Sequence, residues 1–232
     1  MDQLLIAAIG AGGKTTTMRT LARYFRDRSV LFTTTTHIFR LNQDECRLFL
    51  PDPQPEQLLE ALASPGIICT GTMVKPGKLA SLPEALLARA IDRAQVTLYE
   101  ADGAKCLPLK LHRKGEPVVL PQTDRCVVVA GLSALGVPIQ DAVHCWQLDP
   151  EWAQHPDRPV DGAVVTRCIL DAVNSAHLPR ERFRILLNQA DALKQPQEAD
   201  PILDALRHEG LNCRLGSLSQ SPDFLPGWVL ED

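Results

Sequence analysis

GAGGKTT, residues 10–16, is the stretch of this sequence that decides the fold. An apolar run at residues 4–9 leads into it, and apolar residues at helical spacing follow, among them Met18, Leu21 and Phe25. A strand, a glycine-rich turn with Lys-Thr and a helix form the sequence context of a phosphate-binding loop. Glycines let backbone N–H groups surround an anion, and the helix adds the positive end of its dipole.

The loop departs from the full pattern G-x-x-x-x-G-K-[ST] at one position. Ala8 stands where the first glycine is expected, and Gly10 and Gly12 are offered instead. Lys14 is placed to reach the β- and γ-phosphates of a nucleotide, and the Thr15 hydroxyl is placed to ligate Mg²⁺. The alternative is an ordinary strand-to-helix turn with an incidental lysine. We predict these nucleotide-binding residues in the loop: Gly10, Gly12, Gly13, Lys14, Thr15 and Thr16.

The composition indicates a globular protein with one large domain. The chain has 232 residues, of which 45% are hydrophobic and 22% are charged, values that suit a sizeable core. We predict a single nucleotide-binding domain over residues 1–232. The formal net charge of -4 gives no reason to expect binding to nucleic acid or to an anionic membrane. No apolar run reaches the ~18 residues of a membrane span, and we expect no signal peptide before the first strand.

Seven cysteines are present, and none forms a Cys-x-x-Cys pair or another compact ligand spacing. Reduced thiols are typical of a protein in a reducing compartment, so we expect a cytoplasmic protein. Cys69, Cys126 and Cys168 lie in apolar runs and are predicted to be small core residues.

Predicted strands alternate with predicted helices along the chain. We expect strands at residues 30–34, 67–70, 96–99, 126–130, 183–187 and 211–215. This alternation predicts a three-layer α/β fold that resembles the P-loop NTPases, with a mostly parallel, doubly wound sheet and helices on both faces. In such sheets, ligands bind in the crevice at the carboxyl ends of the strands.

Three segments lack a clear period. Residues 71–82 contain glycines, a proline and lysines and are predicted to be a flexible basic loop, which either touches a ligand or is simply solvated. The segment at about residues 141–162 is the predicted irregular insertion, lid or partner surface. The tail at residues 219–232 is predicted to be loosely attached.

Two carboxylates, Glu100 and Asp102, follow the predicted strand at residues 96–99. Side chains alternate along an extended chain, so both point to the same side. One could hold Mg²⁺ through water while the other orients a nucleophile. The alternative is a turn aspartate before a glycine. We predict Lys14, Glu100 and Asp102 as catalytic residues, and Thr15, Glu100 and Asp102 as metal ligands.

Polar residues follow the second predicted strand, and a basic cluster follows Asp102. Residues 34–37, Thr-Thr-Thr-His, either lie beside the phosphates or form an ordinary turn, and the sequence favours neither. The basic cluster at residues 105–114 either clamps an anion or is a solvated loop. Lys105 is its best candidate for binding nucleotide, because it is close to Asp102 in the sequence.

Three segments together resemble the selenium-dependent hydroxylase accessory protein family, the YqeC family. They are the GAGGKT loop, the TTTHIF segment at residues 34–39 and the EADGAK segment at residues 100–105; the EPVVLP segment at residues 116–121 fits as well. The resemblance covers about residues 9–191. It implies a role in the maturation of selenium-dependent molybdenum hydroxylases, with such an enzyme or its cofactor-insertion machinery as partner, and it implies no particular reaction.

The chain departs from the family pattern directly after the EADGAK segment. The family has a Gly-Arg pair at this point, whereas this chain has Cys106 and Leu107. An arginine that could clamp phosphate is therefore missing.

The segment Asn188-Gln189-Ala190-Asp191 follows a predicted strand and resembles the Asn-Lys-x-Asp motif with which GTP-binding proteins read guanine. A carboxylate such as that of Asp191 accepts hydrogen bonds from guanine N1–H and N2–H₂, a pair of donors that adenine lacks. Asn188 is expected to tie the strand end to the phosphate loop. Ser217, after the last predicted strand, lies where such proteins bind the guanine O6. The alternative is that Asn-x-x-Asp only caps a helix.

Three functions remain open from the sequence. The first is a GTP-binding accessory protein that uses Mg²⁺ and possesses slow NTPase activity. The second is an ATP-dependent small-molecule ligase or kinase, since the loop also resembles that of the amino-acid ligases of cell-wall synthesis. The third is a nucleotide-sensing module without turnover. The expected cofactors are Mg²⁺ with GTP or ATP.

Overall fold

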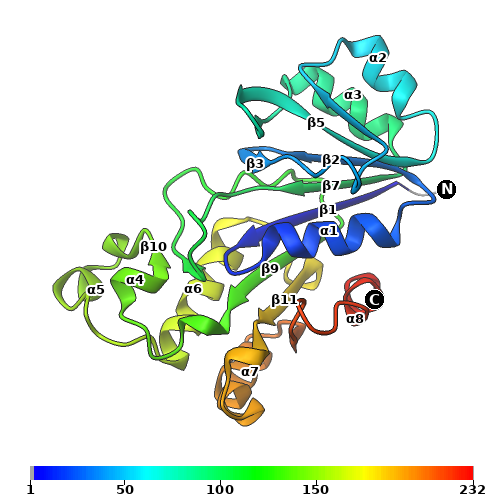
Figure 1. The fold of residues 1–232 in the computed structure, drawn as a ribbon. Coiled ribbons are helices and arrows are strands. Elements are labelled where there is room, and N and C mark those ends of the chain that lie inside the picture. Colours follow the sequence, from blue (N-terminus) through cyan, green and yellow to red (C-terminus); the bar gives the residue numbers. More distant parts are fainter. Residues whose placement is uncertain (1–2, 232) are drawn as a thin grey trace.

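The computed structural model describes residues 3–231. Its centre is a ten-stranded sheet with the order β12-β11-β9-β1-β7-β2-β5-β6-β3, and β4 pairs with β5 beside this path (Figure 1). A small second sheet joins β10 to β8. The strand bounds are β1 Leu4–Gly10, β2 Ser29–Thr34, β3 His37–Phe39, β4 Leu48–Pro51, β5 Gly66–Lys75, β6 Lys78–Ala80, β7 Val96–Glu100, β8 Leu109–Lys110, β9 Arg125–Gly131, β10 Val143–His144, β11 Phe183–Asn188 and β12 Cys213–Leu215.

Helices connect most of the parallel strands. The α-helices are α1 Lys14–Tyr24, α2 Pro55–Ala61, α3 Glu84–Arg93, α4 Ile139–Ala142, α5 Pro150–Gln154, α6 Gly162–Ser175, α7 Asp200–His208 and α8 Phe224–Leu230. Short 3₁₀ turns lie between them: η1 Leu132–Ala134, η2 Trp146–Leu148, η3 Arg180–Arg182, η4 Ala190–Ala192 and η5 Pro196–Ala199.

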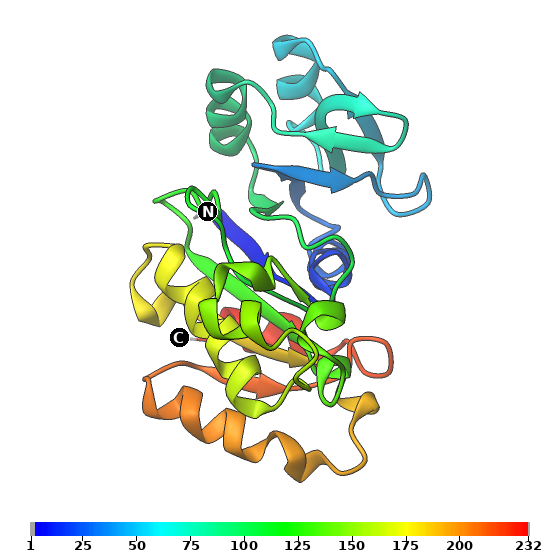
Figure 2. The same ribbon diagram turned by 90° about the vertical axis from the view of Figure 1, so that its left-hand side faces the viewer.

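The sheet has a hydrophobic core on each face. Ile6 and Ala8 of β1 belong to a cluster with α1 and α8, whereas Ala7 and Ile9 belong to a second cluster with α2, α3, α6 and α7. Successive side chains of a strand point to opposite faces, which is why one strand contributes to both clusters. The helices therefore form layers above and below the sheet (Figure 2). The α/β prediction with a mostly parallel sheet is confirmed, while the closer likeness to P-loop NTPases stays a prediction.

The parallel strands end at a common edge. Central strand β1 pairs in parallel with β7 and β9, and β2 and β11 extend this arrangement on the two sides. All of these strands are almost entirely buried, as is typical of parallel strands covered on both faces. Their carboxyl ends bring Gly10, Thr34, Glu100 and Asn188 to the same edge.

The prediction of a flexible loop at residues 71–82 is wrong, because most of this segment is a β-hairpin. Strand β5 continues to Lys75, the chain turns at Pro76 and Gly77, and β6 runs back antiparallel to pair with β3. Leu79 is fully buried, which anchors the hairpin to the core. Side-chain burial of this kind outweighs the turn-forming residues on which the loop prediction rested.

The predicted irregular segment at about residues 141–162 contains short elements. Helix α4 leads into β10, which pairs with β8, and α5 follows. Ile139, Val143 and Trp152 are buried in the core cluster that includes α6. The segment is thus packed, and a role as a lid stays a prediction.

The prediction of a loosely attached tail is wrong. Leu225, Trp228 and Val229 of α8 are buried against the sheet face that also carries α1. The indole N–H of Trp228 donates to Oδ1 of Asn212, with 2.9 Å between the nitrogen and the oxygen.

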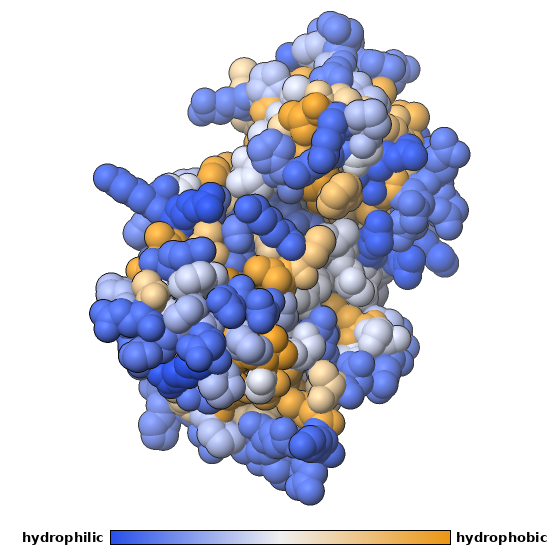
Figure 3. Space-filling model, turned by 60° about the vertical axis from the view of Figure 1, so that its left-hand side comes forward, coloured by the Kyte–Doolittle hydropathy of each residue, from blue (hydrophilic) through white to orange (hydrophobic). Residues whose placement is uncertain are grey.

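The surface view is hydrophilic over most of the face shown, with hydrophobic side chains in small groups (Figure 3). Cys69, Cys126 and Cys168 are buried, as predicted, and all seven cysteines are free thiols. Among residues 3–231, no helix combines the length and the apolar character that crossing a membrane requires.

Candidate functional site

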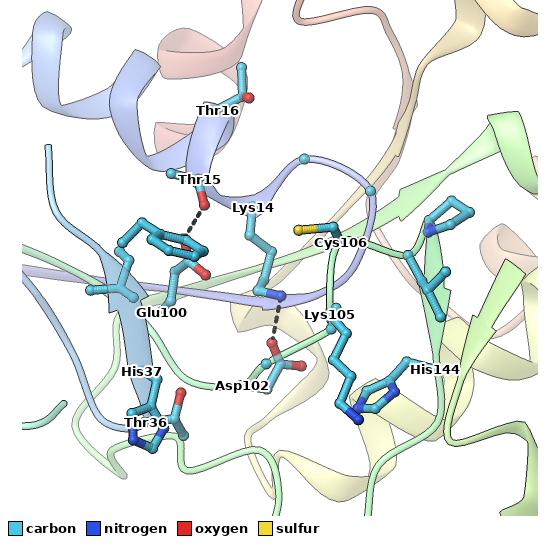
Figure 4. A pocket seen from close by; sticks show the side chains of 18 of the residues that line it. Lys14, Thr15, Thr16, Thr36, His37, Glu100, Asp102, Lys105, Cys106 and His144 are labelled. Atoms are coloured by element: carbon cyan, nitrogen blue, oxygen red, sulfur yellow. Dashed lines mark hydrogen bonds and ion pairs between the residues drawn. The ribbon is translucent and has the colours of Figure 1, made fainter. Parts of the chain in front are cut away.

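A cavity of about 560 Å³ opens at the carboxyl edge of the sheet. Several parts of the chain line it, among them the loop after β1, the paired strands β3 and β6, the segment after β7, residues around β10, and Ser133 and Gln189 after β9 and β11 (Figure 4). The predicted site residues that line the cavity are Gly12, Gly13, Lys14, Thr15, Thr16, Glu100, Asp102 and Lys105.

The loop after β1 has a backbone that only glycine can adopt. Gly12 and Gly13 have φ angles of +79° and +134°, a region that disfavours other residues. A Cβ atom on Gly12 would lie 2.4 Å from the nitrogen of Gly131, and one on Gly13 would lie 2.3 Å from Nδ2 of Asn188. The Asn188 amide donates to the Gly12 carbonyl at 2.8 Å, so the predicted tie between β11 and the loop is confirmed.

The loop presents unpaired donors at the start of α1. Within residues 3–231, the backbone N–H groups of residues 12–16 have no acceptor, and the first helical bond runs from Thr17 to Gly13. Gly13, at the N-cap, offers no side chain to satisfy them. Free N–H groups at the positive end of a helix favour a bound anion. This backbone therefore fits the phosphates of a nucleotide.

Lys14 is buried beside Asp102. Its ammonium lies 3.0 Å from Asp102 Oδ1 and donates to the Gly10 carbonyl at 2.7 Å (Figure 4). Burial alone would lower the pKa of Lys14, but the carboxylates of Asp102 and Glu100 outweigh burial and raise it. Lys14 is therefore a fixed positive charge at the mouth of the loop.

Asp102 is surrounded by donors. Besides Lys14, its Oδ2 accepts from the Gly10 N–H at 2.8 Å and lies 2.7 Å from His112 Nε2 and 3.4 Å from Lys110 Nζ. Burial opposes ionisation, but these cations hold the pKa of Asp102 below its usual range. Because both oxygens are already contacted by positive groups, these contacts argue against the prediction that Asp102 is a metal ligand.

Glu100 and Thr15 form the part of the cavity that suits a metal ion. The Thr15 hydroxyl donates to Glu100 Oε1 at 2.7 Å, and Glu100 is buried. Burial raises the pKa of Glu100 in spite of the opposing effect of Lys14. Mg²⁺ takes one or two protein ligands together with phosphate oxygens and water. The pair could meet that requirement, with Thr15 as a direct ligand and Glu100 as a partner of coordinated water.

The predicted guanine-reading residues lie outside the cavity. Asp191 Oδ1 accepts from the Ser217 hydroxyl, and Asn188 Oδ1 accepts from the Leu218 N–H at 3.1 Å. These residues follow β11 and β12, on the opposite side of β1 from Glu100. Of the Asn-x-x-Asp segment, only Gln189 lines the cavity.

The segment after Asp102 takes an unusual backbone conformation. Lys105 and Cys106 line the cavity with φ angles of 47° and 63°, in the left-handed region. Glycine, which the family resemblance leads us to expect at the position of Cys106, adopts this conformation without strain. The local backbone would therefore suit a glycine at this position, where this chain has a cysteine.

Sequence reasoning missed the buried partners of Asp102. Lys110 and His112 are buried, so the prediction that they belong to a solvated or anion-clamping loop is wrong. His112 Nδ1 lies 2.8 Å from Asp171 Oδ2, which continues the chain of contacts to α6. A usable signal was the alternation of Leu109 and Leu111, both buried, with Lys110 and His112 on the other side of the extended segment.

In the turn after β2, Thr34 has a structural role, whereas Thr36 and the following His37 face the cavity. The Thr34 hydroxyl donates to the backbone carbonyl of Glu100 at 2.8 Å, so its role is structural. Thr36 and His37 line the cavity, as does His144 from β10.

Comparison with known proteins adds the family. A family model described as YqeC protein matches residues 6–147. This chain belongs to the YqeC family. The matched residues include the loop, Glu100, Asp102, Lys105 and His112, and exclude Asn188 and Asp191.

One relative in the YqeC family, from Escherichia coli strain K12, is described as "Uncharacterized protein YqeC". It is 34% identical to this chain over 150 residues, which are 61% of this chain and 57% of the relative. The aligned part thus spans less than two thirds of the relative's length. No solved structure gives a significant match.

Proposed function

We propose that this YqeC-family protein binds a nucleoside triphosphate with Mg²⁺ at the loop of residues 10–16. The observation that carries the proposal is the set of free backbone N–H groups at residues 12–16, next to the Lys14 ammonium. Lys14 would leave Asp102 or remain shared with it when phosphate binds. Thr15 and Glu100 would hold the Mg²⁺ side of the phosphates.

We further propose guanine as the base. The support is the position of Asp191 at the end of β11 beside Ser217, together with the bond from Asn188 to the loop carbonyl of Gly12. Asn188 thereby links the segment proposed to read the base to the loop proposed to hold the phosphates. The support for adenine is weaker, since no comparable feature selects it.

Slow NTP hydrolysis is the proposed activity. A water molecule near Glu100 would be oriented by a buried carboxylate whose pKa is raised, and Lys14 would stabilise charge on the leaving phosphate. The proposed context, assistance in the maturation of selenium-dependent molybdenum hydroxylases, rests on the family resemblance alone.

Fluorescent GTP, GDP, ATP and ADP, titrated with Mg²⁺ into the full chain, test this proposal. We expect guanine nucleotides to bind more tightly, and Lys14→Ala to weaken binding at least about tenfold, as loss of a charged hydrogen bond predicts. Lys75→Ala is the matched control, because Lys75 is exposed on the hairpin and lies outside the cavity.

A separate variant, Asp191→Ala, tests the proposal that the base is guanine. Asp191→Ala should weaken guanine nucleotides about tenfold and leave adenine nucleotides unchanged. Tighter binding of ATP would overturn the guanine assignment and keep the phosphate site. If neither nucleotide binds, or if Lys14→Ala binds like the wild type, the proposed function is wrong. Phosphate release with nucleotide alone would distinguish hydrolysis from binding without turnover.

A further inference from the structure

The antiparallel pair of β3 and β6 forms a wall of the cavity that the nucleotide proposal does not use. His37 and Phe39 are exposed and flank the buried Ile38, so alternation puts both on one face of β3. Phe39 pairs with Lys78 of β6, and the Lys78 ammonium lies 5.8 Å from the centroid of the Phe39 ring. His37, Phe39 and Lys78 all line the cavity, and we call these three residues the hairpin wall.

The cavity also carries positive charge without a carboxylate partner among the described residues. Among the described residues, Lys78 and Lys105 make no ion pair. The carboxylates of the cavity are engaged elsewhere: Glu116 contacts Lys110 at 3.1 Å, and Glu100 accepts from Thr15. The cavity therefore has two uncompensated ammonium groups besides the loop.

Lys105 converges with His144. Figure 4 shows the two side chains ending close together, below Asp102. Burial and the nearby cations Lys110 and Lys105 lower the pKa of His144, so its neutral ring serves as a hydrogen-bonding group rather than a further charge. An anion held by Lys105 would thus find a polar neighbour.

The strand order separates the hairpin wall from the residues proposed to read the base. Asp191 and Ser217 follow β11 and β12 on one side of β1, whereas Glu100 of β7 and the hairpin lie on the other side. Under the proposed function, a triphosphate with its base toward β11 would have its terminal phosphate beside Thr15 and Glu100. The hairpin wall would then lie beyond that phosphate, on the same side of β1 as Glu100.

We propose that the hairpin wall, together with Lys105, binds a second substrate: a small anion with a planar apolar body. The ammonium groups of Lys78 and Lys105 would hold its carboxylate or phosphate group, and the face of Phe39 would hold the planar part. This anion would lie opposite the terminal phosphate of the nucleotide. The relative placement of the two ligands rests on the proposed function, whereas the anion site itself does not.

The test uses two fluorinated probes, 4-fluorobenzoate and 4-fluorophenyl phosphate, followed by ¹⁹F NMR with the full-length protein. The first represents a carboxylate and the second a phosphate, and neutral 4-fluorobenzamide is the probe control. We expect one of the anions to bind, with and without a saturating non-hydrolysable GTP analogue and Mg²⁺. Benzamide should bind at least about tenfold more weakly.

Phe39 and Lys75 are exposed and Lys78 is half-buried, so none of the variants removes a side chain from the core. Lys78→Ala should weaken the bound anion about tenfold and Phe39→Ala about three- to tenfold, while Lys75→Ala should have no effect. None of these variants should change nucleotide affinity. Circular dichroism would confirm that each variant is folded.

Two results would overturn the second-substrate site. In the first, the nucleotide analogue displaces both anions and Lys78→Ala weakens nucleotide binding, which would assign the wall to the nucleotide. In the second, neither anion binds better than benzamide, or Lys78→Ala and Phe39→Ala bind like the wild type. Anion binding that survives in a protein unable to bind any nucleotide would refute the proposed function and keep this site.

Discussion

Asp102 concentrates the electrostatics of the site in one side chain. It is fully buried and contacts Lys14, Lys110, His112 and the Gly10 N–H. A buried carboxylate is tolerated only when charge and hydrogen bonds compensate for lost hydration. Asp102 therefore fixes the position of Lys14 and of the loop backbone at once.

Replacement of Asp102 by asparagine keeps the shape and removes the charge. We expect Asp102→Asn to lower the free energy of unfolding by about 3–5 kcal/mol, because the buried cations lose their counter-ion. Urea denaturation measures this effect. The control is Asp204→Asn, since Asp204 forms an exposed pair with Arg207 and should change stability by no more than about 0.5 kcal/mol. Equal effects of the two variants would contradict the role given to Asp102.

His112 should make stability depend on pH. Burial alone would lower its pKa, but the hydrogen bonds to Asp102 and Asp171 outweigh burial and raise it. Because folding raises this pKa above the unfolded value of about 6.5, the protonated ring stabilises the fold below that pH, and the contribution is lost as pH rises through the folded pKa.

The measurement compares the wild type with His112→Gln by denaturation at about pH 6 and about pH 9. The difference in free energy of unfolding should be larger at the lower pH. A difference that stays constant between the two conditions would show that His112 is not protonated in the folded protein.

At the scale of single elements, local sequence patterns correctly predicted those helices and strands whose formation depends on residues close together in the sequence. The strand, loop and helix at residues 4–24 follow from apolar spacing and glycines, and so does the end of β7 at Glu100. The hairpin was missed because its pairing with β3 joins residues far apart in sequence. The burial of Lys110 was missed for a different reason: its partners Asp102 and Glu116 are close in sequence, but the irregular loop that brings them to Lys110 has no helical or strand period to reveal the contacts.

The packing of helix α8 was also missed from the sequence, and its contribution to stability can be measured. Trp228 is buried and hydrogen-bonded to Asn212, so Trp228→Ala should lower the free energy of unfolding by about 3–5 kcal/mol. Phe39→Ala is the control, because Phe39 is 58% exposed and its loss should cost no more than about 0.5 kcal/mol. Chemical denaturation that found both effects equally small would restore the idea of a loose tail.

At the scale of the whole molecule, one sheet and two continuous core clusters connect the ends of the fold. The same cluster contains Leu58 of α2 and Leu206 of α7, which lie beyond opposite edges of the central strands. The alternation of strands and helices predicted this layered class. It did not predict the strand order, because the order depends on crossover connections that no local pattern records.

This continuity predicts a single cooperative unfolding transition. The tryptophans, Trp146, Trp152 and Trp228, all lie in the C-terminal half, so their fluorescence reports on that half, while far-ultraviolet circular dichroism reports on the whole. We expect the two transitions to coincide. Leu58→Ala, in the other half, should shift both by about 2–5 kcal/mol, whereas exposed Val74→Ala should shift neither. Two separate transitions would divide the chain into independent domains.

Strand β5 belongs to both parts of the sheet, since residues 66–69 pair with β2 and residues 72–75 pair with β6. Through β2 and β7 the same sheet continues to β1, so β5 would hold the hairpin wall at a fixed place relative to the phosphate loop. The two proposed ligands, held on such a frame, would meet with little further loss of translational and rotational freedom. For well-oriented groups, that is equivalent to effective concentrations on the order of 10⁵ M or more. The length of this strand would then determine the size of the second substrate that can contact the terminal phosphate. Insertions within the strand would change that size.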